Sequence, residues 1–309
     1  MPYLEQLTVR LAAGAMHLPE EARRRHAAML AGAQNEDGGF AGRRGPSDLY
    51  YTGFGLRGLA LVGGLSEEVA ARAGRFLAER VARQVPSIDF VSLVFSAALL
   101  ETLSGIDVFA DAGRDRRQTV AAALDRFRRP DGGYAKNDRS PHASTYHTFL
   151  AAACKQLVGL PLDDAGQMVA LVGSRRRDDG GFVELAPLSQ SGTNPTAAAI
   201  GLLRLTGSLD EPTRAQAAAF LAGMQTVEGG FRANRRLPVA DLLSTFTALV
   251  SLADLDALAA VDAAGARRYA ESLGQAEGGF RGGVWDDAAD VEYTFYGLGA
   301  LALSSGLDL

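Results

Sequence analysis

The sequence of 309 residues predicts an all-α fold, an (α/α)6 barrel or α-α toroid of six helical-hairpin repeats with GGF turns. Three observations predict it. A Gly-Gly-aromatic triplet recurs about every 48 residues, an apolar helical segment follows each triplet, and a charged amphipathic segment precedes it. Such periods are typical of repeat architectures, in which each unit buries its apolar face against its neighbours. We therefore expect residues 1–309 to form a single barrel domain.

The triplets mark the turns between the two helices of each repeat. They begin at Gly38, Gly132, Gly180, Gly229 and Gly278. The first interval is twice as long as the others, so the second repeat has lost its glycines but keeps its apolar helix. A glycine beyond a helix end adopts the left-handed conformation without steric cost, and a second glycine permits a sharp return. The aromatic residue can fill the seam between repeats, so the triplets need bind nothing.

The segments before the triplets predict an outer ring of helices. In SEEVAARAGRFLAERVARQ and DEPTRAQAAAFLAGMQ, apolar residues recur at the spacing of a helix with one wet face. Ser66 and Asp210 stand at their starts and are expected to act as N-caps.

The segments after the triplets predict an inner ring, because they are nearly free of charge and must be covered on both sides. Asp48, Asp241 and Asp290 are expected to cap three of them. The six inner helices are expected near residues 48–63, 90–105, 144–159, 192–207, 241–254 and 290–305.

Composition excludes several classes of function. Apolar residues make up 47% and charged residues 22% of the chain, as in ordinary globular proteins. The net charge of -5 argues against a nucleic-acid partner. The single cysteine, Cys154, excludes an internal disulfide and fits a reducing compartment. There is no signal-peptide pattern and no apolar run long enough to span a bilayer. We expect a cytoplasmic protein that does not span the membrane.

With its repeats aligned, the chain resembles the β subunits of protein prenyltransferases and, less closely, the squalene and terpene cyclases. The resemblance covers nearly the whole chain. It rests on the repeat itself, on Gln34, Gln225 and Gln275 before the glycines, and on the order GGFRANRRLPVADLLSTF then GGFRGGVWDDAADVEYTFYGL. It implies an isoprenoid diphosphate held in an aromatic-lined cavity. It also implies a helical partner subunit, while a homodimer is equally open.

The resemblance implies a lost zinc site. In the family, zinc bound by Asp, Cys and His activates the acceptor thiol. Asp241 matches the Asp, but Leu243 stands in place of the Cys and Tyr293 in place of the His. Because leucine cannot coordinate a metal, we expect no zinc. Asp241 and Tyr293 remain candidate catalytic residues, with a helix cap as the alternative for Asp241.

The diphosphate site is matched only in part. Of the family's basic residues before the fifth inner helix, only Arg235 has a loose counterpart, and arginine suits diphosphate because it forms bidentate, charge-assisted bonds. The alternative is a set of solvated charges at the barrel rim. The candidate diphosphate-binding residues are Arg235, Arg236, Arg232, Lys136 and Arg139.

The acidic WDDAAD segment has two interpretations. Asp286, Asp287 and Asp290 form a weak candidate site for magnesium, which prefers carboxylates and keeps waters and substrate phosphates. The segment is also the nearest approach to the DxDD acid motif of squalene-type cyclases, which this chain lacks.

Aromatic residues in the first halves of the inner helices predict an isoprenoid pocket. An apolar pocket near basic loops suits a long hydrocarbon with an anionic head, and aromatic faces can stabilise an allylic carbocation. His147 is a candidate catalytic base, or else a core histidine. The predicted pocket residues are Tyr51, Phe54, Tyr146, Phe149, Phe246, Tyr293 and Tyr296.

The sequence therefore favours an enzyme that acts on an isoprenoid diphosphate without zinc, by prenyl transfer or by terpenoid cyclisation. A non-catalytic barrel that binds an isoprenoid or another lipid is one alternative. A scaffold for contacts with another protein is the other. The chain length of the isoprenoid, the acceptor and the product stay open.

Overall fold

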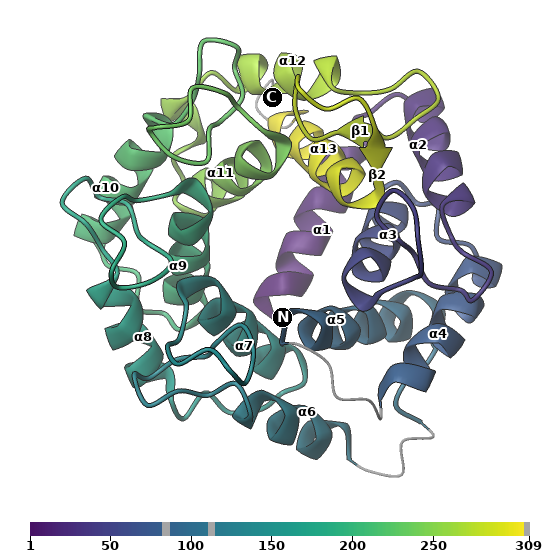
Figure 1. Ribbon diagram of the computed structural model, residues 1–309. Helices are drawn as coiled ribbons and strands as arrows, with labels where there is room; N and C mark the ends of the chain where they lie inside the picture. The colour runs from purple at the N-terminus through teal and green to yellow at the C-terminus, as the bar shows by residue number, and fades with distance from the viewer. Residues whose placement is uncertain (82–86, 111–114, 306–309) are drawn as a thin grey trace.

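The computed structural model describes residues 1–81, 87–110 and 115–305, and it confirms the (α/α)6 barrel (Figure 1). Neighbouring inner helices pack side by side, and the last packs against the first, so the ring is closed. The inner helices are α3 (Leu49–Leu61), α5 (Ser87–Ser104), α7 (Thr145–Leu157), α9 (Thr193–Leu205), α11 (Leu242–Asp254) and α13 (Val291–Ser304).

The outer layer consists of the amphipathic helices. As predicted, Ser66 Oγ and Asp210 Oδ1 accept hydrogen bonds from the first turns of α4 and α10. The segment 82–86, where the second repeat would carry its turn, lies outside the described residues. The outer helices are α2 (Glu20–Gly32), α4 (Glu67–Val81), α6 (Arg116–Asp125), α8 (Ala165–Ser174), α10 (Glu211–Ala222) and α12 (Ala263–Ser272).

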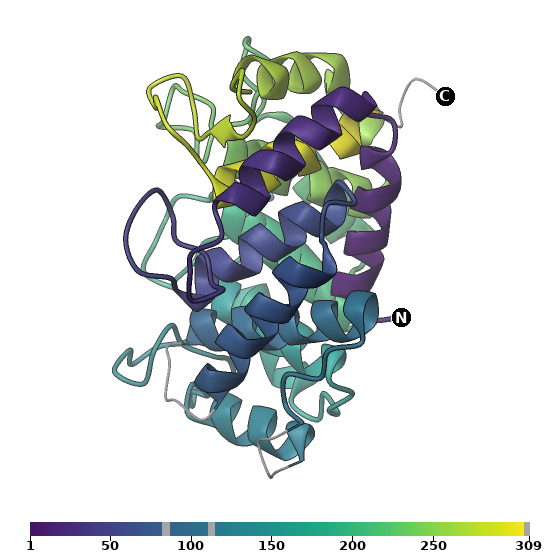
Figure 2. The same cartoon turned by 90° about the vertical axis from the view of Figure 1, so that its right-hand side faces the viewer.

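Helix α1 (Tyr3–Ala15) is an addition that the repeat pattern does not predict. It runs across the ring at the end where the inner helices finish, opposite the loops that follow the triplets (Figures 1 and 2). Tyr3 donates a hydrogen bond of 2.6 Å to Asp254 at the end of α11, and Arg10 forms an ion pair of 2.9 Å with the same carboxylate. Farther along α1, a Cβ on Gly14 would overlap the backbone of Ala302 in α13. Helix α1 therefore covers this end of the barrel.

The remaining elements are small. A 3-10 turn, η1 (Leu258–Ala260), links α11 to α12. In the sixth repeat, β1 (Phe280–Arg281) and β2 (Ala289–Asp290) pair antiparallel. Within the described residues, no helix is both long and apolar enough to cross a membrane.

The first glycine of each triplet has two reasons to be glycine. Its φ lies between 84° and 98° in all five triplets, a region that disfavours other residues. It also touches the backbone of the next outer helix, so that a Cβ on Gly38 would overlap the carbonyl group of Arg72 in α4. The last turn closes the ring in the same way, because Gly278 lies against Arg25 of α2.

A repeated threonine ties each turn to its inner helix. Thr245 is typical: its hydroxyl accepts a hydrogen bond of 2.9 Å from the N–H of Phe231 and donates one of 2.7 Å to the carbonyl of Asp241. The same pair of bonds holds the other four triplets, through Thr52, Thr148, Thr196 and Thr294. Buried N–H groups in the turns are thereby satisfied. The aromatic residues of the triplets are fully buried, as predicted for seam fillers.

Candidate functional site

Aromatic side chains from α3, α11 and α13 meet inside the ring. The Phe54 ring lies 5.2 Å from Tyr296 and 5.6 Å from Phe295, measured between ring centroids. Phe246 lies 5.3 Å from Phe295 and 5.4 Å from Tyr296. Tyr50 extends the cluster, 4.9 Å from Phe54. The structure thus brings together Phe54, Phe246 and Tyr296 of the predicted pocket. We refer to Tyr50, Phe54, Phe246, Phe295 and Tyr296 as the interior cluster.

A cation that the sequence interpretation missed lies against this cluster. The guanidinium carbon of Arg57 stands 4.1 Å from the Phe54 centroid and 4.8 Å from that of Phe295. Its Nε donates to the carbonyl of Gly53 at 2.9 Å, and it forms no ion pair with the carboxylates of the described residues. Burial lowers the pKa of Arg57, although a guanidinium stays protonated in a protein. Arg57 is the single charged residue of α3, a signal that the sequence offered.

A carboxyl group, also missed as an interior residue, completes the polar part of the site. Glu292 accepts hydrogen bonds from the hydroxyl groups of Tyr50 at 2.6 Å and Tyr296 at 3.2 Å. Burial raises the pKa of Glu292 despite these bonds. It is the single charged residue of α13, just as Arg57 is in α3. The interior therefore combines aromatic faces with one cation and one carboxyl group.

Tyr146 enters the same region from α7, across the ring. Its electrostatic neighbours include Arg57 and Glu292, and burial raises its pKa to about 12. Although protein surrounds the ring, 37% of the surface of Tyr146 is accessible to water. Side chains therefore do not fill the interior completely beside Tyr146.

The remaining predicted pocket residues lie apart from the interior cluster or at its edge. Tyr293 is 6.3 Å from Tyr296, measured between centroids, and its ring covers Gly282 in the sixth loop. Tyr51 packs on Gly42 of the first loop. Phe149 meets Tyr3 of α1 edge-on, with centroids 5.8 Å apart. The predicted pocket is thus distributed along the barrel.

The position of the family's zinc site holds a helix cap. Asp241 accepts hydrogen bonds from the N–H and the hydroxyl of Ser244, at 2.7 and 2.9 Å, which confirms the cap prediction. Leu243 offers no ligand atom, and burial raises the pKa of Tyr293 to about 12. Nowhere in the described residues do three His, Cys, Asp or Glu side chains gather closely enough to hold a metal ion. Asp241 and Tyr293 as catalytic residues stay predictions.

The structure does not bring the predicted diphosphate-binding residues to one point. Arg232 donates to the carbonyl of Gly223 at the end of α10, and Arg235 lies over Phe220 of the same outer helix. Arg236, Lys136 and Arg139 are exposed. Arg232 and Arg235 thus lie against the outer helix α10, whereas Arg57 lies against the interior cluster.

The acidic segment of the sixth loop forms ion pairs with the first loop. Arg43 of the first loop pairs with Asp286 and lies 3.5 Å from Asp290. Asp290 also caps α13, as predicted, while Asp287 is exposed. These contacts link the first repeat to the sixth. A magnesium site at the three carboxylates stays a prediction.

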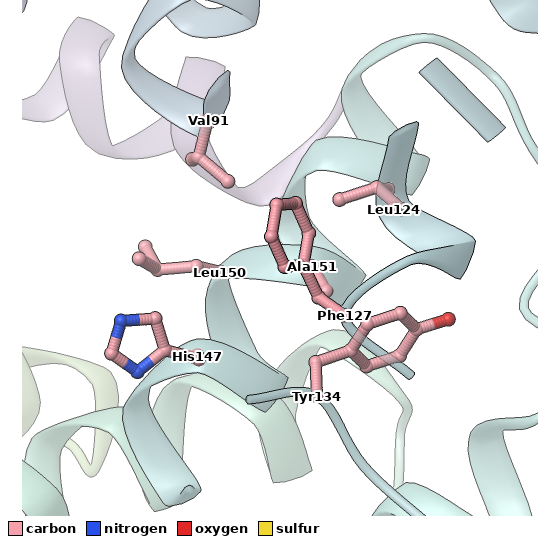
Figure 3. Close-up of a pocket in the computed structure, with 7 residues that line it drawn as sticks. All are labelled: Val91, Leu124, Phe127, Tyr134, His147, Leu150 and Ala151. Carbon is pink, nitrogen blue, oxygen red and sulfur yellow. The ribbon is translucent and has the colours of Figure 1, made fainter. Parts of the chain in front are cut away.

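His147 of α7 lies beside a small cavity in the wall of the barrel (Figure 3). It borders a cavity of about 10 Å³ between α5, α6, α7 and the segment that follows α6. The other lining residues are Val91, Leu124, Phe127, Tyr134, Leu150 and Ala151. Its Nδ1 lies 2.7 Å from Ser144 Oγ, and its Nε2 has no partner among the described residues. Burial lowers the pKa of His147 to about 4. His147 is therefore neutral at pH 7, and its ring lies 5.4 Å from that of Tyr146, measured between centroids. Its role as a catalytic base stays a prediction.

The comparison with protein families decides the identity of the fold. Residues 14–78 and 196–308, more than half of the chain, match the model of the prenyltransferase alpha-alpha toroid domain. The chain belongs to this family. Membership in this family supports the prediction that this toroid belongs to a family of enzymes that handle isoprenoids. A comparison with curated proteins gave no match.

Several solved structures share the toroid fold. A chain of Candida albicans protein geranylgeranyltransferase-I, complexed with GGPP, aligns with a TM-score of 0.74 and 15% identity over 93% of this chain and 92% of that chain. Type II terpene cyclase MstE from Scytonema aligns with a TM-score of 0.65 and 16% identity, over 97% and 98%. An α-1,6-mannanase of Salegentibacter aligns with a TM-score of 0.64 and 12% identity, over 93% and 99%. Because barrels with such different names share the fold, the ligand has to be argued from the site.

Proposed function

We propose that this toroid binds an isoprenoid diphosphate inside the ring and acts on it by prenyl transfer or terpenoid cyclisation, without the family's zinc site. The observation that carries the proposal is the interior cluster with Arg57 against its rings. Aromatic faces suit a long hydrocarbon, and a buried guanidinium supplies the charge that an anionic head group needs.

Arg57 is the proposed anchor of the head group. A guanidinium has five N–H donors, and the described hydrogen bonds of Arg57 occupy only its Nε. Its remaining donors suit the oxygens of a diphosphate, with which arginine forms strong bidentate bonds. This places the head group against Arg57, whereas Arg235 and Arg236 would guide the ligand from the rim.

Glu292 is the proposed proton carrier. In prenyl transfer, the allylic carbon–oxygen bond breaks, diphosphate leaves, and the acceptor loses a proton as its new bond forms. In a cyclisation started by protonation, an acid gives a proton to an alkene, and a base later removes one. A buried carboxyl with a raised pKa can carry a proton in either direction, and the hydroxyl groups of Tyr50 and Tyr296 orient it.

One observation favours the second candidate, a non-catalytic barrel that binds the isoprenoid. Arg57 already occupies the faces of Phe54 and Phe295, which would otherwise stabilise a carbocation. A fixed positive charge at about 4 to 5 Å repels a second one, and the repulsion is strong in a dry interior. Binding without turnover is the outcome that this feature supports.

The deciding experiment measures binding and turnover separately. Purified protein is titrated calorimetrically with farnesyl and geranylgeranyl diphosphate, with and without magnesium, and pyrophosphate release is followed in parallel. Release at a rate above that of the free diphosphate supports the enzyme. Because a cyclisation started by protonation leaves the diphosphate in place, the organic product is also analysed by mass spectrometry. Tight binding without release and without a cyclised product supports the carrier. If neither compound binds, both candidates are excluded and the scaffold remains.

Metal content and assembly are measured on the same preparation. Elemental analysis tests the proposal that zinc is absent, because stoichiometric, tightly held zinc would contradict it. Light scattering distinguishes a monomer from a homodimer. A helical partner subunit, the other possibility that the family suggests, requires purification from the native source.

A further inference from the structure

The five triplet turns meet the next outer helix in similar seams, which differ in the side chain that faces the second glycine. In three of them the second glycine packs against an aromatic ring of the outer helix. These rings are Phe76 of α4, Phe220 of α10 and Tyr269 of α12. On α2 the corresponding residue is Met29, and on α8 it is Leu171, which contacts Gly133. The seam between the triplet of the third repeat and α8 therefore lacks a ring that most of its counterparts have.

An arginine lies one helical turn beyond the missing ring. Arg175 is only 4% exposed, yet its contacts are long: 3.5 Å to the carbonyl of Ala143 and 3.8 Å to Asp131. Its Nε is buried and has no partner among the described residues. Buried guanidinium nitrogens are normally hydrogen-bonded, so this site calls for an acceptor that the chain itself does not supply.

The first seam shows what Arg175 lacks. Arg80 follows Phe76 by one turn, as Arg175 follows Leu171, and it also lies 3.8 Å from the aspartate of its triplet, Asp37. The guanidinium carbon of Arg80 stands 3.3 Å from the centroid of the Phe76 ring, and Arg80 donates to the Phe76 carbonyl at 2.8 Å. An arginine in this position therefore stacks on a ring when the seam contains one.

A groove of about 820 Å³ lies where the ring is missing. It runs on the outside of the barrel between the third and fourth loops and α8, away from Arg57 and Glu292. Leu171 and Arg175 form its inner wall, and the exposed Leu185 and Pro187 form its outer edge. His142 adds a further polar group. Asp131, 3.8 Å from Arg175, also lines the groove. The groove has the volume of a small-molecule site and a mainly apolar wall beside a buried cation that its own carboxylate neighbour approaches only at long range.

We propose that this groove binds an aromatic ring that carries a carboxylate. The ring takes the place of the missing seam aromatic and stacks on the guanidinium of Arg175. The carboxylate accepts the hydrogen bonds that Arg175 does not make within the chain. Stacking and charge-assisted bonding are the two interactions for which a guanidinium is suited at once. The site does not depend on the function proposed for the barrel interior.

The test compares three probes of similar size by calorimetry and ligand-observed NMR. Benzoate carries both features, cyclohexanecarboxylate carries the anion without the flat ring, and benzyl alcohol carries the ring without the anion. Benzoate is expected to bind at least fivefold more tightly than either. Equal affinity of the three probes, or no binding of benzoate, would overturn the proposal.

Variants locate the site. Leu171→Phe supplies the ring that other seams contain and should reduce benzoate affinity at least tenfold, whereas Leu171→Met should retain it. Arg175→Met should also lose binding. Arg57→Met, which removes the cation of the barrel interior, should leave benzoate affinity unchanged. If Arg57→Met abolishes binding while Leu171→Phe does not, benzoate binds in the interior and the groove is excluded. Circular dichroism and thermal melting verify the fold of each variant.

Discussion

The guanidinium carbon of Arg57 lies 4.1 Å from the centroid of the ring of Phe54, three residues earlier on the same inner helix. Because α-helical side chains point toward the N-terminus, Arg57 reaches back over the turn that carries Phe54. A cation held in this way needs no carboxylate for its position. It is therefore available to a ligand, and this arrangement separates the interior site from the rim.

Replacing Arg57 should distinguish the two proposed positions of the head group. Arg57→Met keeps much of the apolar volume and removes the charge, so affinity for geranylgeranyl diphosphate should fall more than tenfold. The rim double variant, Arg235→Ala with Arg236→Ala, should reduce it less, because both side chains lie outside the ring. Calorimetry gives both affinities. A larger loss in the rim variant would move the head group to the rim.

Glu292 should make the fold less stable as the pH rises. The folded state raises the pKa of Glu292 above its ordinary value of 4.5 and thus holds its proton more tightly than the unfolded chain. Stability contributed by this proton is complete below pH 4.5 and is lost as the pH rises through the folded pKa. Glu292→Gln should remove this contribution, so that the melting temperature falls by about 1 to 3 °C less between pH 4 and 8 than in the wild type. The exposed Glu277→Gln serves as the control, and an identical pH dependence in both variants would contradict the prediction.

His26 should have the opposite effect. Its Nδ1 accepts a hydrogen bond from Gly279 at 2.9 Å, its ring stacks on Phe280, and burial lowers its pKa to about 4. The unfolded chain binds this proton more readily, so stability falls as the pH drops from about 6.5 to 4, by at most about 3 kcal/mol.

The His26 effect can be isolated by substitution. His26→Gln, which retains an acceptor and cannot titrate, should reduce this acid sensitivity, and the exposed His17→Gln should not. Denaturant unfolding at pH 7, 6 and 5 measures both. If the unfolding free energy of His26→Gln falls with pH as steeply as that of the wild type, the acid sensitivity has another source.

The repeated threonine should be a stability determinant. Thr245→Val conserves the shape but leaves the buried N–H of Phe231 without its acceptor, which should cost about 1 to 3 kcal/mol. Thr206→Val is the matched control, since the hydroxyl of Thr206 bonds only to carbonyls of its own helix, Leu202 and Leu203. Urea denaturation gives the two values. Equal losses of unfolding free energy in the two variants would mean that the hydrogen bond between turn and helix does not stabilise the fold.

The repeat made most of the fold predictable, because the glycine spacing and the alternation of charged and apolar helices determine a closed ring. Asp48, Asp241 and Asp290 were predicted as caps from position alone, and the structure confirms them. Helix α1 could not be predicted in this way, since it belongs to no repeat and is held by contacts with Asp254 and Ala302, distant in sequence.

The site was predictable only in part. Aromatic residues in the first halves of the inner helices pointed to Phe54, Phe246 and Tyr296. Arg57 and Glu292 are isolated charges in apolar helices, which is a signal that the sequence carries. The prediction instead placed the anion-binding residues in the basic loops. The groove at Arg175 depends on Leu171 being smaller than the rings in equivalent seams, and this difference acquires meaning only when the packing is known.

Helix α1 covers one end of the barrel, so the proposed ligand would enter the ring from the opposite end, where the loops after the triplets lie. A molecule held inside the ring has to leave by the way it entered, since the far end is covered by α1 and secured by Tyr3 and Asp254. A second molecule can then enter only after the first has left. Under the proposed function, a product that stays bound excludes the next substrate, so inhibition by product should be competitive, and the depth of the ring should limit the length of the isoprenoid chain that it admits.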